Sequence, residues 1–327
     1  MSAGLLDVES LSVHFPVRGA GGAPATLRAV DEVGFGIAAG ETLGVVGESG
    51  CGKSTLARAV LRLVPVASGA IRFDGTDYTR SDERGLRPLR RALRMVFQDP
   101  LASLNPRFTV RQSVREPLDI FEPRRASRER DRLAVAMLDR VGLGAAFAER
   151  YPHELSGGQN QRVSIARALV ADPRLVICDE AVSALDVSIQ AQILNLLADI
   201  QRDTGIALLF ISHDLSVVRH LSRRLLVLYL GRVMEYGDAA TIFANPRHPY
   251  TRSLIDAVPV PDPAIERARR APAQPGELPS PLAPPSGCVF RTRCPRASNV
   301  CTINRPPLRG APGAQFACHH PLEEPAP

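Results

Sequence analysis

A glycine-rich segment near the N-terminus constrains the fold more than any other feature of the chain. The segment Gly47–Ser54 reads GESGCGKS and fits the pattern G-x-x-x-x-G-K-[ST]. A short β-branched run precedes it and an amphipathic helical pattern follows it. Glycines let the backbone bend so that successive N–H groups point at phosphate oxygens, and the start of a helix adds partial positive charge. The segment therefore predicts a nucleotide phosphate cradle, with candidate binding residues Gly47, Glu48, Ser49, Gly50, Cys51, Gly52, Lys53, Ser54 and Thr55.

Two acidic residues supply the other groups that phosphoryl chemistry needs. Asp179 and Glu180 follow the apolar run LVIC, which is typical of a buried strand. We expect Asp179 to help hold Mg²⁺ together with the Ser54 hydroxyl, while Lys53 reaches the β- and γ-phosphates. Glu180 is the next residue along the backbone, points elsewhere, and is predicted to orient or deprotonate an attacking water.

Strand and helix patterns alternate along most of the chain. Strands are predicted over residues 5–15 (an edge strand), 30–37, 174–180, 206–214 and 224–237. Residues 100–150 have a mostly helical pattern, and another helix follows Gly157. This order predicts an α/β fold, with a three-layer core around a mainly parallel sheet.

Length and composition narrow the class of protein. A chain of 327 residues corresponds to about two domains. Its longest apolar runs, such as LLVLYL at 225–230, are far shorter than the roughly 20 residues of a membrane helix, and the N-terminus has no secretory pattern. The net charge of +6 raises the alternative of a nucleic-acid partner, but the basic residues are dispersed, so an arginine-rich surface is the preferred interpretation and no nucleic-acid partner is expected.

The composition changes near the C-terminus. Nine prolines lie between Pro259 and Pro285, which predicts a linker or an extended strap. A small tail follows with four cysteines, Cys288, Cys294, Cys301 and Cys318. Because no secretion signal is visible, a metal site is favoured over disulfides. The spacing of the cysteines is compatible with zinc, with an iron–sulfur cluster or with unliganded thiols.

A second glycine-rich segment identifies the family that the chain resembles. LSGGQ at 155–159 precedes a helix, so its amides form a second anion cradle. Two cradles in one chain make sense if one serves the nucleotide of another subunit. From about residue 5 to about residue 255 the chain resembles the ATP-binding subunits of ABC transporters, which implies a P-loop NTPase of ABC type that hydrolyses ATP with Mg²⁺ in a sandwich dimer. The partner's nucleotide would meet Ser156, Gly157, Gly158 and Gln159.

The resemblance implies roles for further residues. Phe15, closing the first strand, resembles the aromatic residue that stacks on adenine. Gln98 resembles the glutamine that contacts Mg²⁺ and senses the membrane subunit, and Asp186, in SALD at 183–186, resembles the loop that crosses the dimer interface. His213 resembles the switch histidine at the γ-phosphate. Gln98, Glu180 and His213 are thus the candidate catalytic residues.

Two positions depart from the family pattern. Asn160 stands where a basic residue is commoner, and Ala181 replaces the proline that often follows the catalytic acid. Neither change removes a group that the chemistry needs.

The stretches QDPLASLNPR at 98–107 and NPRHPYTRSLIDAVP at 245–259, with the cysteine tail, resemble the oligopeptide/dipeptide subgroup of the peptide/nickel import branch. This implies an ATPase domain over residues 1–257, with a helical subdomain at about 100–160, and an extension over 258–327. It further implies a role in peptide import, at the cytoplasmic face of the cell membrane. The implied partners are an identical or paralogous ATPase subunit, two transmembrane permease subunits and an extracytoplasmic substrate-binding protein. The resemblance also implies a [4Fe–4S] cluster on the four cysteines, with zinc as the alternative. Import of nickel or another small solute, and a soluble nucleic-acid-linked ABC ATPase, are the alternatives.

Overall fold

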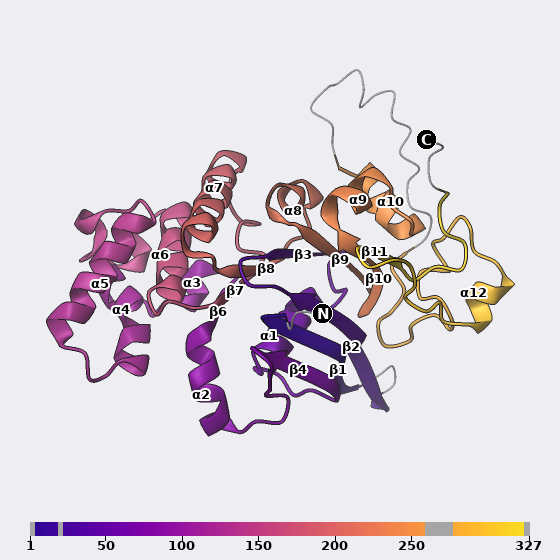
Figure 1. Cartoon of the computed structure of the whole chain (residues 1–327), viewed down its shortest axis with the longest axis horizontal. Helices are drawn as coiled ribbons and strands as arrows, with labels where there is room; N and C mark the ends of the chain where they lie inside the picture. Colours follow the sequence, from indigo (N-terminus) through magenta and orange to yellow (C-terminus); the bar gives the residue numbers. More distant parts are fainter. Residues whose placement is uncertain (1–3, 19–21, 259–276, 324–327) are drawn as a thin grey trace, which may run out of the picture. The chain divides into compact units, whose positions relative to one another are not determined.

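The computed structural model describes residues 4–18, 22–258 and 277–323 (Figure 1). Backbone contacts divide the chain into two compact units. The first unit comprises residues 1–36, 43–79 and 212–327, and the second comprises residues 37–42 and 80–211, each over its described part. We describe each unit by itself.

An antiparallel sheet forms one part of the first unit. Its strand order is β2 (Pro24–Ile37), β1 (Leu6–Arg18), β4 (Ser68–Phe73) and β5 (Thr76–Asp77). β1 is therefore an interior strand, so the prediction of an edge strand was wrong, and β1 continues beyond Phe15 to Arg18. The register between β1 and β4 shifts between Glu9 and Ser12. Gly69 lies opposite this irregularity with φ of 97°, and a Cβ there would lie 2.6 Å from the Glu9 carbonyl oxygen.

Buried strands form the other part of the first unit. β3 (Thr42–Val46) pairs in parallel with β9 (Arg224–Tyr229), which pairs antiparallel with β10 (Arg232–Asp238). Every residue of β3 is buried, which explains its continuous apolar run. α1 (Lys53–Val60) packs against β1, and the remaining helices here are α8 (Leu215–Leu221), α9 (Ala239–Ala244) and α10 (Pro249–Asp256).

The C-terminal tail belongs to the first unit. It contains α12 (Asn299–Ile303) and β11 (Ala314–Phe316), and β11 pairs antiparallel with β10. Most of the predicted proline-rich linker, residues 259–276, lies outside the described residues.

The second unit has a parallel sheet and most of the helices. β7 (Leu175–Asp179) lies between β6 (Leu93–Val96) and β8 (Ala207–Ile211), in parallel with both. The helices and turns are α2 (Glu83–Ala92), α3 (Pro100–Ser103), α4 (Val110–Phe121), α5 (Ser127–Arg140), the 3₁₀ turns η2 (Ala145–Phe147) and η3 (Pro152–Glu154), α6 (Gly157–Leu169) and α7 (Val187–Thr204). α4, α5 and α6 pack on one another, as Figure 1 shows in magenta.

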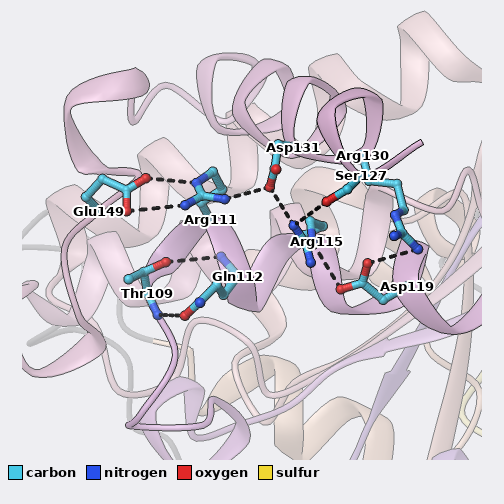
Figure 2. A network of polar contacts seen from close by, with 9 residues as sticks. All are labelled: Thr109, Arg111, Gln112, Arg115, Asp119, Ser127, Arg130, Asp131 and Glu149. Carbon is cyan, nitrogen blue, oxygen red and sulfur yellow. Dashed lines mark hydrogen bonds and ion pairs between the residues drawn. The ribbon is translucent and has the colours of Figure 1, made fainter. Parts of the chain in front are cut away.

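A network of polar contacts joins α4 and α5 (Figure 2). Asp131 of α5 accepts hydrogen bonds from Arg111 at 2.6 Å and from Arg115 at 2.9 Å. Arg111 also donates to Glu149 at 2.8 Å, and the two acids hold the pKa of Arg111 above its usual range through these hydrogen bonds. Single exposed ion pairs stabilise little, but a shared network fixes how the two helices lie.

Within the described residues, no helix is both long enough and apolar enough to cross a membrane.

Candidate functional site: two phosphate-directed loops and a carboxylate pair

The glycine-rich segment of the first unit forms a tight loop between β3 and α1. Gly47, Gly50 and Gly52 have φ of 154°, 77° and 105°, values that favour glycine. A Cβ on Gly52 would lie 2.2 Å from the Ala29 carbonyl oxygen, so no other residue fits there without movement. The loop thus leads directly into the N-terminus of α1, which begins at Lys53.

The Lys53 side chain lies across this loop. It is only 4% exposed. Its Nζ donates to the carbonyl oxygens of Gly47 at 2.7 Å and Glu48 at 3.0 Å. Burial raises the pKa of the neighbouring Cys51 thiol, so this cysteine stays protonated and acts as a packing residue. Ser54 and Thr55 follow in the first turn of α1 and are half-buried.

Glu48 has two partners from later parts of the first unit. Its N–H donates to the Tyr250 hydroxyl at 2.9 Å, and its carboxylate accepts from Arg293 Nη1 at 2.7 Å. Neither partner was predicted from the sequence. The signals that could have found them were the motif HPY at 248–250, used there only as a subgroup marker, and the arginine before Cys294.

The motif HPY itself has a clear structural reason. Pro249 occupies the first turn of α10, and His248 is the N-cap, its Nδ1 accepting the N–H of Tyr250 at 3.0 Å. His248 is fully buried, which lowers its pKa to about 3, so the ring is neutral and can accept this bond. The motif therefore aims the Tyr250 hydroxyl at the backbone of Glu48.

The second unit brings Gln98 and Glu180 together. Gln98 Nε2 donates to Glu180 Oε2 at 3.0 Å. Glu180 has φ of 47°, and its N–H donates to the Ile211 carbonyl at 3.1 Å. This left-handed backbone turns the chain directly after Asp179, which is 3% exposed at the end of β7. Two acids on consecutive residues can therefore serve different tasks.

The segment LSGGQ begins α6. Ser156 Oγ accepts the N–H of Gln159 at 3.3 Å, and the Gln159 side chain accepts the N–H of Ser156 at 2.9 Å, which is a capping box. Ser156 and Gly157 are exposed. A Cβ on Gly158 would lie 2.6 Å from Ile189 Cγ2, so glycine lets α7 approach closely.

Asn160 is a structural residue of this segment. It is 1% exposed, and its Nδ2 donates to the carbonyl oxygens of Pro152 at 2.9 Å and Leu155 at 3.3 Å. The departure from the family pattern at this position therefore has a role of its own, which is to hold the turn that leads into LSGGQ.

The remaining candidate residues lie as follows. His213 is exposed in the first unit between β8 and α8, where Asp214 caps α8 by accepting the N–H of Ser216 at 2.8 Å. Asp186 is exposed at the N-cap of α7 and makes no capping hydrogen bond through its side chain. Phe15 is half-buried within β1.

The four tail cysteines come together in the first unit. The Cys288 N–H donates to the Cys301 carbonyl at 2.8 Å. Burial, with a smaller contribution from the other three thiols, raises the pKa of Cys318 to about 11. All four are free thiols. Thiol donors suit a soft metal or an iron–sulfur cluster. In the part of the chain that the structure describes, however, no three His, Cys, Asp or Glu side chains are arranged to hold a metal ion.

Comparison with known proteins places these features in a family. The ABC transporter family matches residues 30–183, and the family "Oligopeptide/dipeptide transporter, C-terminal region" matches residues 234–301. The chain is 54% identical to the probable peptide ABC transporter ATP-binding protein y4tS of Sinorhizobium fredii, over 98% of this chain and 90% of that protein. It is 51% identical to the oligopeptide transport ATP-binding protein OppF of Salmonella typhimurium, over 94% and 93%, and 50% identical to OppF of Escherichia coli, over 96% and 95%.

Solved structures agree with the sequence relatives. A dimeric ATP-binding cassette in a post-hydrolysis state with ADP and Pi is 28% identical, with a TM-score of 0.65, over 72% of this chain and 98% of that one. The cbiO1 protein of Clostridium perfringens, part of an ABC transporter complex, is 29% identical with a TM-score of 0.65, over 74% and 92%. The predicted α/β fold of ABC type is thereby confirmed. The chain belongs to the ATP-binding proteins of ABC transporters, in the group that has the oligopeptide/dipeptide transporter C-terminal region.

Proposed function

We propose that the protein hydrolyses ATP to energise the import of peptides through a membrane transporter. The observation that carries the proposal is the joint presence of an ABC ATPase and the C-terminal region of oligopeptide/dipeptide transporters in one chain. The relatives of about 50% identity are named as oligopeptide transport proteins, and they align over nearly the whole chain.

The loop from Gly47 to Thr55 would bind the phosphates of ATP. Lys53 Nζ now donates to two loop carbonyls, and we propose that phosphate oxygens take over these bonds. Hydroxyl and carboxylate oxygens are ligands that Mg²⁺ prefers, so Ser54 and the buried Asp179 fit this ion, with Gln98 as a further ligand. Bound Mg²⁺ would neutralise negative charge on the phosphates. Phe15 would lie against adenine.

Glu180 would act as the general base toward the attacking water. Its hydrogen bond from Gln98 fixes the carboxylate while leaving acceptor capacity for a water proton. His213 would contact the γ-phosphate from its exposed turn. Hydrogen-bond donors of the chain would stabilise the charge that develops on the transferred phosphoryl group.

The second phosphate-directed loop would serve the nucleotide of a partner. Ser156, Gly157, Gly158 and Gln159 lie at a helix N-terminus that is partly exposed. Asp186 is exposed where it would face the same interface. Two identical or paralogous subunits would therefore sandwich two ATP molecules, and a solved relative is itself a dimer.

Coupling to transport requires membrane subunits. We propose two transmembrane permease subunits, contacted through the helices that follow Gln98, and an extracytoplasmic substrate-binding protein. The protein would lie at the cytoplasmic face of the membrane, bound through the permease. We further propose residues 1–257 as the ATPase domain, with a helical subdomain at about 100–160, and residues 258–327 as the extension.

The tail cysteines would hold a [4Fe–4S] cluster, with zinc as the alternative. What supports this proposal is that four thiols lie in one short tail, where the other three contribute to raising the pKa of Cys318. A short tail has little core of its own, so the group would act as a structural staple. Iron, sulfide and zinc analysis of protein purified without oxygen tests it. About four iron and four sulfide per chain is the expected result, and stoichiometric zinc with no sulfide would contradict it.

Two other functions remain as alternatives. Import of nickel or another small solute would use the same ATPase, because solute choice depends on the other subunits. A nucleic-acid-linked ATPase is favoured only by the charge of +6. ATPase activity that rises with added DNA or RNA and falls with salt would support it.

Uptake in reconstituted vesicles tests the proposed function. The whole transporter, purified through this chain from native membranes, is placed in proteoliposomes with ATP inside and a labelled peptide mixture outside. Peptide accumulation that depends on ATP and on the binding protein is the expected result. ATP-dependent uptake of Ni²⁺ without uptake of peptides would contradict it.

A further inference from the structure

The N–H, the carbonyl and the carboxylate of Glu48 each take part in a hydrogen bond. Its carbonyl oxygen accepts from Lys53 at 3.0 Å, its N–H donates to Tyr250 at 2.9 Å, and its carboxylate accepts from Arg293 at 2.7 Å. Glu48 is the second residue of the phosphate loop, whereas Tyr250 and Arg293 lie about 200 and 245 residues further along. The C-terminal part of the chain therefore reaches into the loop in two places.

The contact between Arg293 and Glu48 is largely shielded from solvent, and other groups hold Arg293 in place. Its side chain is 9% exposed, and the side chain of Glu48 is 25% exposed. Arg293 also donates to the Tyr229 hydroxyl at 3.4 Å, and its guanidinium lies 5.9 Å from the centre of that ring. An arginine held on a ring and a hydroxyl loses little further freedom when it pairs with a carboxylate.

The segment that carries Arg293 is anchored to the same unit by packing. Phe290 is 1% exposed, and its ring meets those of Tyr229 and Tyr250 edge-on or tilted, each at 5.3 Å between centres. The Arg293 N–H donates to the Phe290 carbonyl at 3.0 Å. Aromatic contacts of this kind fix a short segment that has no regular secondary structure.

The charge of Glu48 gives this contact a consequence for ATP. A carboxylate in a loop that binds a polyphosphate repels it, and the repulsion is strong where solvent is partly excluded. We propose that Arg293 is a positioning residue of the ATP site: it neutralises Glu48 and holds the loop open to phosphate, so the C-terminal extension completes the nucleotide site. This inference rests on the proposed function, because it assumes that the loop binds ATP.

Binding of ATP and of ADP to the full-length chain tests the proposal. Arg293→Met should raise the Kd for ATP by about tenfold, because a half-buried carboxylate is left unpaired. The Kd for ADP should rise less, since ADP carries less negative charge. Arg293→Lys keeps the charge and should stay within about threefold of the parent protein. The matched control is Arg305→Met, which removes another arginine of the extension that pairs with Glu32 at 2.6 Å and should not change the Kd.

A double variant separates positioning from a general loss of structure. Glu48→Gln together with Arg293→Met should recover most of the affinity that Arg293→Met loses, because the repelling charge is gone. Equal ATP affinity of Arg293→Met and the parent would overturn the proposal. A double variant as weak as Arg293→Met, with unchanged unfolding temperature, would also overturn it. A parent chain that binds no ATP would instead contradict the proposed function.

Discussion

Gln98 and Glu180 form a hydrogen bond of 3.0 Å although 82 residues separate them in the sequence. The register of the parallel sheet explains how they meet. Val96, the last residue of β6, is paired with Cys178 of β7, and each candidate lies two residues beyond its paired position. Parallel strands end at the same edge, so the two side chains arrive side by side. A residue proposed as a metal contact thus also positions the proposed base.

Glu180→Gln should lower ATP turnover by at least about 100-fold while leaving the Kd for ATP within about threefold. The amide keeps the hydrogen bond with Gln98 but cannot take a proton from water. Single-turnover hydrolysis and equilibrium ATP binding measure the two effects. Glu83→Gln is the matched control, because that exposed acid lies on α2 and forms an ion pair with Arg90 at 2.8 Å. Turnover above about a tenth of normal in Glu180→Gln would show that another group is the base.

Lys53→Ala should raise the Kd for ATP by about tenfold or more. The variant removes the ammonium group of a side chain that is 4% exposed and whose Nζ donates to the Gly47 carbonyl oxygen within the loop at 2.7 Å. A positive charge in a phosphate loop contributes strongly because little solvent screens it. Titration with a fluorescent ATP analogue measures the change, with Arg58→Ala on the exposed side of α1 as control. An unchanged Kd in Lys53→Ala would contradict the phosphate-loop assignment.

Asn160→Asp should destabilise the protein by about 2–3 kcal/mol, because a buried carboxylate oxygen would replace the donor that the Pro152 and Leu155 carbonyls share. Urea unfolding measures the free energy. Asn105→Asp is the control, since Asn105 is exposed and its side-chain oxygen, which aspartate retains, accepts the N–H of Arg107. Equal midpoints for the two variants would mean that the Asn160 side chain does not hold the turn before LSGGQ.

The free energy of unfolding should decrease as the pH is lowered below neutral, partly because of His248. Its folded pKa of about 3 lies below the ordinary value of 6.5, so the unfolded chain binds the proton more readily. This contribution is complete above pH 6.5 and is lost as the pH falls, by about 2 kcal/mol at pH 5. The N-cap of α10 requires an acceptor, which His248→Asn keeps without titrating. Urea unfolding at pH 7 and pH 5 should show a smaller loss in the variant, whereas equal losses would contradict the assignment.

Local sequence patterns predicted the parts of the fold that depend on neighbouring residues. The glycine-rich loop, the buried strand before Asp179 and the helix after LSGGQ need only spacing and turn chemistry, and each is found where the pattern predicted it. The position of β1 inside a sheet depends on pairing with β2 and β4, which no local pattern specifies. The contact between Glu48 and Arg293 spans 245 residues and is set by the packing of Phe290, so it emerges only from the folded chain.

Two residues for which the sequence indicated no structural role have one in the folded chain, because their contacts form only when the chain folds. Asn160 appears in the sequence as a departure from a common basic residue, and its role depends on two backbone carbonyls that the preceding turn presents. Tyr250 belongs to a motif that marks a subgroup, and its hydroxyl meets the loop only because α10 begins at Pro249. The roles of Asn160 and Tyr250 therefore follow from their tertiary contacts and not from their residue types.

The central claim is that ATP joins two such subunits, each completing the other's site. Light scattering after size exclusion measures it most directly, with the Glu180→Gln variant mixed with its cognate ATPase subunit, with and without MgATP. We expect the mass of one chain, 35.3 kDa, without nucleotide and about twice that mass with MgATP. Ser156→Arg in both subunits should abolish the larger species, because the arginine side chain would block the exposed LSGGQ segment. A single-chain mass at every protein concentration in saturating MgATP would contradict the account.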